Sequence, residues 1–186
     1  YARRVDPSTG QPQGSVITVA FISAGASRFS PKPAFYNGNY FIGWSESSNI
    51  TGGTGQFIGS WVNESTGVVA SPSKVSMLPG GAAVNGFEVI AHPGGFVGVA
   101  CNTVVCKGVS FGDPNPGSFP SFVVNLVSNT ESGVAVEYDG TRWLVAWTDS
   151  RGAHDGIFAV RVDAQGNVLD PSAIEVSNRH PSVFGD

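Results

Sequence analysis

An internal repeat constrains this chain more than any other feature of its sequence. Residues 35–46 and 137–149 match closely, and a weaker copy occupies 87–101. Each close match has an aromatic residue, Asn-Gly or Asp-Gly, an apolar stretch ending in Trp, and an acidic residue two positions later. Asn-Gly and Asp-Gly tolerate positive φ and favour tight hairpin turns. Each copy therefore predicts a strand, a turn and a second strand, at a period of roughly 50 residues.

The second half of each unit repeats as well. Residues 57–63 and 157–163 read as strands followed by the turns 64–67 and 164–167, and residues 1–6 with 7–10 have the same form. In the middle unit, 105–111 and 122–127 fill these roles around a bridge rich in Pro and Gly. The period fits one four-stranded propeller blade. The sequence thus predicts an all-β fold, a β-propeller-like repeat of four-stranded antiparallel blades, with a β-sandwich pair as the alternative.

The predicted register divides a single propeller-like repeat region, 1–186, into blades. It gives a partial blade at 1–30, a blade at 31–80, a degenerate blade at 81–130, a blade at 131–178, and the first strand of a further blade at 179–186. In a propeller, the loops joining strands two to three and one blade to the next share one face. Here these are roughly 45–56, 102–105, 148–156, 23–33, 78–86 and 177–181, and we expect a ligand on that face.

Composition agrees with many short strands and excludes two classes of partner. Val is abundant and Leu scarce, while Gly 25 and Pro 12 supply turn chemistry. The net charge is −4 with no basic stripe, which argues against nucleic-acid binding. No apolar run is long enough for membrane insertion. The chain opens at Tyr1 without Met, so we expect a processed product or a piece of a longer chain, whose edge strands join the remainder of that chain or self-associate.

Cys101 and Cys106 are the only cysteines. Their C-x4-C spacing does not suit a zinc knuckle, and no second pair completes four ligands. The repeat register places them opposite each other across a hairpin, where facing residues are close enough for a disulfide. We therefore predict a disulfide, an oxidising compartment, and a secreted or cell-surface location.

The stretch from Tyr138 to Val176 resembles a β-propeller-type repeat of large secreted bacterial proteins, of the form FDG-x-x-aromatic-LVVW-x-D-x-R … DG-x-VLDP-x-GI. The matching parts are 147–151 and 163–174, where Asp170-Pro171-Ser172-Ala173-Ile174 is very close to the pattern. The resemblance weakens over 30–78 and is poor over 84–128. It implies propeller architecture and secretion, and no particular activity.

Candidate ligand-face residues gather in the loop after the second strand. They are Asp149, Arg151, His154 and Asp155, with Glu46 as the counterpart of Asp149 in the first blade. Paired carboxylates suit hydrolase chemistry, and a carboxylate cluster is also a candidate Ca²⁺ site. Because one short loop seldom makes an active site, we favour a salt bridge between Asp149 and Arg151 or a hydrogen bond that caps the loop. We expect no catalytic residues and no cofactor.

Other side chains have simpler interpretations. Asn49 and Asn63 begin N-glycosylation sequons in predicted loops. Trp44 and Trp147 are expected to pack between adjacent blades, whereas Trp61, on a third strand, is expected nearer the surface.

The sequence favours a non-enzymatic extracellular binding or structural module that presents loops from one propeller face to a glycan or protein partner. One alternative is part of a secreted polysaccharide-acting hydrolase or lyase, with acids converging from several blades. Another is a subunit of a surface filament or large assembly formed through exposed edge strands.

Overall fold

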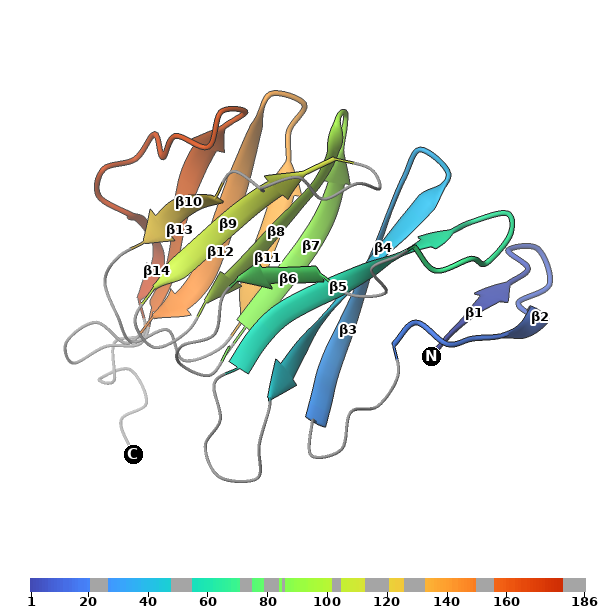
Figure 1. Ribbon diagram of the computed structural model, residues 1–186. Coiled ribbons are helices and arrows are strands. Elements are labelled where there is room, and N and C mark those ends of the chain that lie inside the picture. The colour runs from blue at the N-terminus through green and yellow to red at the C-terminus, as the bar shows by residue number, and fades with distance from the viewer. Residues whose placement is uncertain are drawn as a thin grey trace, which may run out of the picture.

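The computed structural model describes residues 1–20, 27–47, 55–70, 75–78, 84, 86–101, 105–112, 121–125, 133–149 and 156–178. These residues form an all-β structure of strands β1 to β14, as the sequence predicts, with no helix among them (Figure 1).

The strands form one hairpin and three four-stranded antiparallel sheets. The hairpin pairs β1 (Ala2–Val5) with β2 (Pro12–Ile17). The first sheet contains β3 (Ser27–Tyr36), β4 (Asn39–Ser47), β5 (Gly55–Asn63) and β6 (Val75–Leu78). The second contains β7 (Gly86–His92), β8 (Gly95–Cys101), β9 (Cys106–Phe111) and β10 (Ser121–Asn125). The third contains β11 (Val134–Tyr138), β12 (Arg142–Asp149), β13 (Gly156–Asp163) and β14 (Ile174–Asn178). In each sheet the four strands are consecutive in the chain and neighbours in space.

The Asn-Gly and Asp-Gly pairs form the predicted turns at the first hairpins of the first and third sheets. Asn37 and Gly38 both have positive φ, 49° and 77°, which is the two-residue turn that fits the twist of paired strands. In the third sheet the turn is longer, and the Asp139 carboxylate holds it by accepting hydrogen bonds from the backbone N–H groups of Thr141 and Arg142, each at 2.8 Å.

A second kind of turn follows β1, β5 and β13, and it shows that the repeat includes the N-terminal hairpin. Asp6, Asn63 and Asp163 each accept, through one side-chain oxygen, backbone N–H groups of the turn that follows. A glycine with positive φ completes each turn, at Gly10, Gly67 and Gly166. By this correspondence, β1 and β2 are equivalent to the third and fourth strands of the later sheets.

The Asp6 turn is expected to weaken at acidic pH, whereas the Asn63 turn is not. Hydrogen bonds from Ser8, first from its side chain, and from Thr9 lower the pKa of Asp6 from 3.8 to about 2. A lowered pKa means that the ionised form stabilises the fold above the ordinary value, so this contribution is lost as the pH falls from 3.8 to about 2. An NMR titration should show the Ser8 and Thr9 amide signals moving in this window while those of Ser65 and Thr66, bound by the neutral Asn63 side chain, stay fixed. Equal movement at both turns would contradict the assignment.

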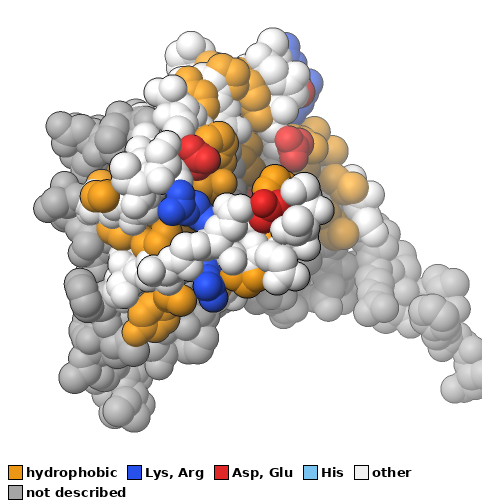
Figure 2. All heavy atoms as spheres, turned by 90° about the vertical axis from the view of Figure 1, so that its right-hand side faces the viewer, with side chains coloured by type: hydrophobic (Ala, Val, Ile, Leu, Met, Phe, Trp, Pro, Cys, Tyr) orange, Lys and Arg blue, Asp and Glu red, His pale blue; other side chains and the backbone are white. Residues whose placement is uncertain are grey.

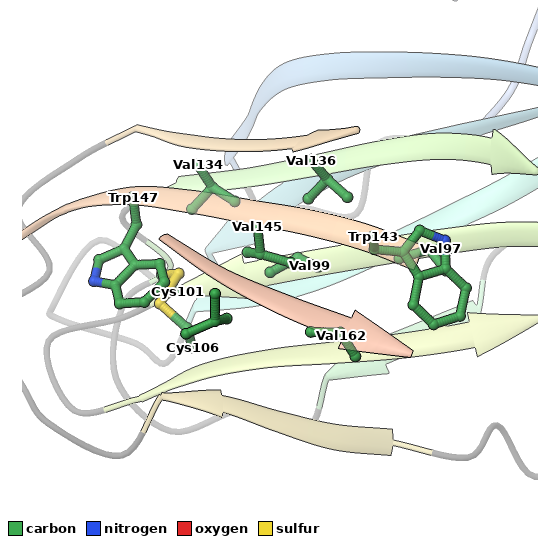
Figure 3. Packing of buried hydrophobic residues seen from close by; sticks show 11 residues of the cluster. Val97, Val99, Cys101, Cys106, Val134, Val136, Trp143, Val145, Trp147 and Val162 are labelled. Carbon is green, nitrogen blue, oxygen red and sulfur yellow. A yellow bond between two sulfur atoms is a disulfide. The ribbon is translucent and has the colours of Figure 1, made fainter. Parts of the chain in front are cut away.

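The three sheets stack face to face in chain order (Figure 1). We call the face of a sheet that looks toward the following sheet its forward face, and the opposite face its backward face. The first strands of successive sheets contact each other, β3 with β7 and β7 with β11. Aromatic side chains dominate the layer between the first and second sheets, and Val, Trp and the cysteines fill the layer between the second and third (Figure 3).

The tryptophans are core residues. Trp44 and Trp147 are buried on the backward faces of the first and third sheets, which confirms their predicted role between sheets. The prediction for Trp61 is wrong, because this side chain is also buried. It lies on the forward face of β5, where its ring centroid is 5.0 Å from that of Phe41 and 5.9 Å from that of Phe111 of the second sheet. Position on a third strand does not expose a side chain when the following sheet covers that face.

Candidate functional site

The predicted ligand face corresponds to one edge of the stack. The second strands β4, β8 and β12 all end at this edge, the lower edge in Figure 1, and the third strands β5, β9 and β13 begin there. We call it the loop edge. Among the described residues, it carries Glu46, Asp149 and the two cysteines.

Asp149 is buried, with only 1% of its surface exposed. It alternates along β12 with Trp143, Val145 and Trp147, so its side chain lies on the backward face of the third sheet. Its Oδ2 accepts a hydrogen bond of 3.3 Å from the indole Nε1 of Trp147. The carboxylate therefore fixes a core tryptophan at the point where the strand ends.

Glu46 occupies the equivalent position in the first sheet and is also buried, at 8% exposure. It follows Trp44 by two residues, and Trp44 packs against the N-terminal hairpin side of the sheet. Glu46 and Asp149 thus lie in two different layers of the stack, with the first and second sheets between them. The structure does not bring these two acids into one site.

The remaining predicted candidates are outside the described residues. These are Arg151, His154, Asp155 and Asn49. The salt bridge between Asp149 and Arg151 and the candidate Ca²⁺ cluster accordingly stay predictions. Within the described ranges, no group of three or more His, Cys, Asp or Glu side chains is placed to hold a metal ion.

Asn63 was predicted in a loop but is the last residue of β5, and its side chain contacts the turn that follows. Its Oδ1 accepts from the backbone N–H and the hydroxyl of Thr66, both at 2.9 Å, and its Nδ2 donates to Asn39 Oδ1 at 3.4 Å. Nδ2 is the atom that a glycan would modify, so glycosylation would replace the contact with Asn39.

The predicted disulfide is confirmed. Cys101 and Cys106 are directly paired residues of β8 and β9, and their Cα atoms are 4.0 Å apart. Both are buried in the layer between the second and third sheets, in the same cluster as Trp147 (Figure 3). The bond closes the loop edge of the second sheet and covers the side of the Trp147 indole.

Breaking this bond is expected to destabilise the protein. Closing a loop as short as that between Cys101 and Cys106 restricts the unfolded chain enough to contribute about 2 kcal/mol. Urea denaturation with and without reductant measures the loss as a shift in midpoint. The double variant Cys101→Ala, Cys106→Ala is the control, because its midpoint should not respond to reductant. A wild-type midpoint that ignores reductant would contradict the structural role.

Contacts between sheets include polar ones that the sequence analysis missed. Lys32 Nζ of β3 pairs with Glu88 Oε2 of β7 at 2.9 Å and ties two first strands together. Arg4 of β1 donates from Nη1 to the carbonyl oxygens of Glu64 and Ser65, at 3.2 and 2.9 Å, and holds the hairpin to the first sheet. The first pair has no local signal, because 56 residues separate its members. Arg4 could have been found by aligning the third strands, since Arg161 occupies the same repeat position.

No family model, no curated protein and no solved structure matches this chain.

Proposed function

We propose that this chain is a non-enzymatic extracellular binding or structural module of β-propeller type, which presents its loop edge to a glycan or protein partner. Propeller blades are four-stranded antiparallel sheets arranged radially around an axis. The three sheets here have that strand order, pack face to face, and meet along their first strands. These features support blades arranged around an axis on the side of β3, β7 and β11.

The observation that carries the non-enzymatic part of the proposal is the environment of Asp149. An acid or base in catalysis must reach a substrate atom within hydrogen-bond distance. Asp149 instead lies inside the stack, bound to Trp147 Nε1, and Glu46 is buried in another layer. The two acids that the repeat places at the loop edge are both buried, and one of them binds a core tryptophan.

The extracellular part of the proposal rests on the disulfide. Cys101 and Cys106 are bonded, and disulfides persist chiefly in oxidising compartments. No helix of membrane-spanning length and hydrophobicity occurs among the residues that the structure describes.

Polysaccharide assays with a matched variant test the proposal. Neutral and acidic polysaccharides are incubated with the wild type and with Asp149→Asn, and cleavage is measured as new reducing ends and unsaturated sugars. Binding to the same polysaccharides is measured as retardation in affinity electrophoresis. Asn keeps an oxygen that accepts from Trp147 Nε1, so the variant should fold. We expect no products, and the same retardation for both proteins. Products that form with the wild type and vanish with Asp149→Asn would establish an enzyme.

A further inference from the structure

The exposed hydrophobic side chains gather at the two ends of the stack. Among the described residues, none of the exposed large hydrophobic side chains belongs to β7, β8 or β9, because the neighbouring sheets cover both faces of these strands. The strands of the hairpin, the first sheet and the third sheet contribute most of them. Exposed large hydrophobic side chains are therefore found on the outer sheets and not on β7, β8 or β9.

At the C-terminal end, the forward face of the third sheet is open. Leu144 and Ile157 are 47% and 43% exposed there, and Ile174, which pairs with Ala159 on the same face, is 43% exposed. We call these three residues the C-end face. Strand pairing makes Leu144 equivalent to Phe41 and Val97, and Ile157 equivalent to Phe57 and Cys106. All four equivalents are fully buried, because a following sheet covers them.

At the N-terminal end, the backward face of the hairpin is open. Val5 and Val16 are each 56% exposed, and both alternate with residues that pack forward onto the first sheet. We call these two residues the N-end face. The hairpin lies on the right-hand side of Figure 1, the side that faces the viewer in Figure 2. The turn correspondence makes Val5 equivalent to Val62 and Val162, which are buried under a preceding sheet.

We propose that the C-end face of one molecule binds the N-end face of a second copy, head to tail. This inference rests on the proposed architecture of stacked blades. The contact between the two copies would resemble the interface between successive sheets within the chain. It would use residues at the same repeat positions, and a forward face would again pack on a backward face.

A polar contact between the hairpin and the first sheet also supports binding of a second copy of the chain at the C-end face. Arg161 has the repeat position of Arg4, on the forward face of the third strand. Asp170 binds its Nε and Nη2, and leaves Nη1 without a partner among the described residues. Arg4 uses its own Nη1 to hold carbonyl oxygens of the next third-to-fourth turn. In the head-to-tail contact, the corresponding turn of the second copy begins at Asp6, whose carboxylate gives it a charge complementary to that of Arg161.

Light scattering on the full chain with paired variants tests this proposal. The C-end variant is Leu144→Lys, Ile157→Lys, and the N-end variant is Val5→Lys, Val16→Lys. The matched control is Val68→Lys, because Val68 is equally exposed but lies beside a turn, outside both end faces. We expect the mass of the wild type and of the control to rise above 19.3 kDa as concentration increases. Each end variant alone should stay at that mass, and an equimolar mixture of the two should give a species of twice the mass.

The mixture separates the head-to-tail contact from other modes of association. Each end variant retains one intact face, so a doubling of mass on mixing requires that unlike faces bind. A wild type that remains monomeric at all concentrations would overturn the inference, as would association that survives in either end variant alone. Neither result affects the proposed non-enzymatic module, which is tested by product formation, and circular dichroism of each variant shows whether it is folded.

Discussion

Replacing Trp147 by Ala is expected to lower the free energy of unfolding by about 3–5 kcal/mol, the range for removing a buried tryptophan. The indole is almost fully buried between the second and third sheets, in one cluster with Cys101, Cys106 and Val134 (Figure 3). Its removal leaves a cavity in that layer and takes away the N–H that binds Asp149 Oδ2. Chemical denaturation monitored by circular dichroism measures the loss.

Leu144→Ala is the control for this prediction, because Leu144 lies on the same strand and points to the open forward face. Measured on the dilute monomer, it should change stability by less than about 1 kcal/mol, as exposed substitutions usually do. If Leu144→Ala cost as much as Trp147→Ala, the assignment of the two faces of the third sheet would be wrong.

Gly59→Ala is expected to destabilise the fold by about 1–3 kcal/mol or more, although it adds a single methyl group. A Cβ at this position would lie 2.0 Å from Cζ of Phe41. The Phe41 ring has no room to move aside, since Trp61 and Phe111 pack against it at centroid distances of 5.0 and 4.7 Å. The close approach of β5 to an aromatic ring requires glycine here.

A double-mutant cycle identifies the cause of this loss. Phe41→Leu shortens the side chain that the new methyl group would meet, so the double variant should be less destabilised than the sum of the single variants. Gly112→Ala is the matched control, because a Cβ there meets no atom within 4 Å, and its midpoint should stay at the wild-type value. Additive losses in the cycle would show that the clash with Phe41 is not responsible.

The features that the sequence predicted correctly depend on local chemistry or on pairing across one hairpin. Asn37-Gly38 predicts its turn because both residues tolerate positive φ, and the disulfide follows from a short connection between two paired strands. The burial of Trp61 was missed because it depends on which face the next sheet covers, and nothing near residue 61 encodes that. The pairing of Lys32 with Glu88 depends in the same way on contact between sheets.

The loop-edge acids show the same limit. The repeat predicted correctly that Glu46 and Asp149 occupy equivalent positions, but it did not predict that both side chains are buried. The same acid on the open face of a sheet would be exposed to solvent. Residue spacing in the sequence therefore predicted the positions of these side chains along the strands, but not which face of each sheet is buried.

Hydrogen–deuterium exchange on the dilute monomer gives the sharpest test of a stack of equivalent sheets. The second sheet lies between two four-stranded sheets, and every residue of β8 is buried. We predict that amides of β8 exchange most slowly, and that those of the β1–β2 hairpin and of β14 exchange fastest, because these strands lie at the open ends. Exchange of β8 as fast as that of β14 would contradict the stacked architecture, and with it the proposed function and the head-to-tail contact.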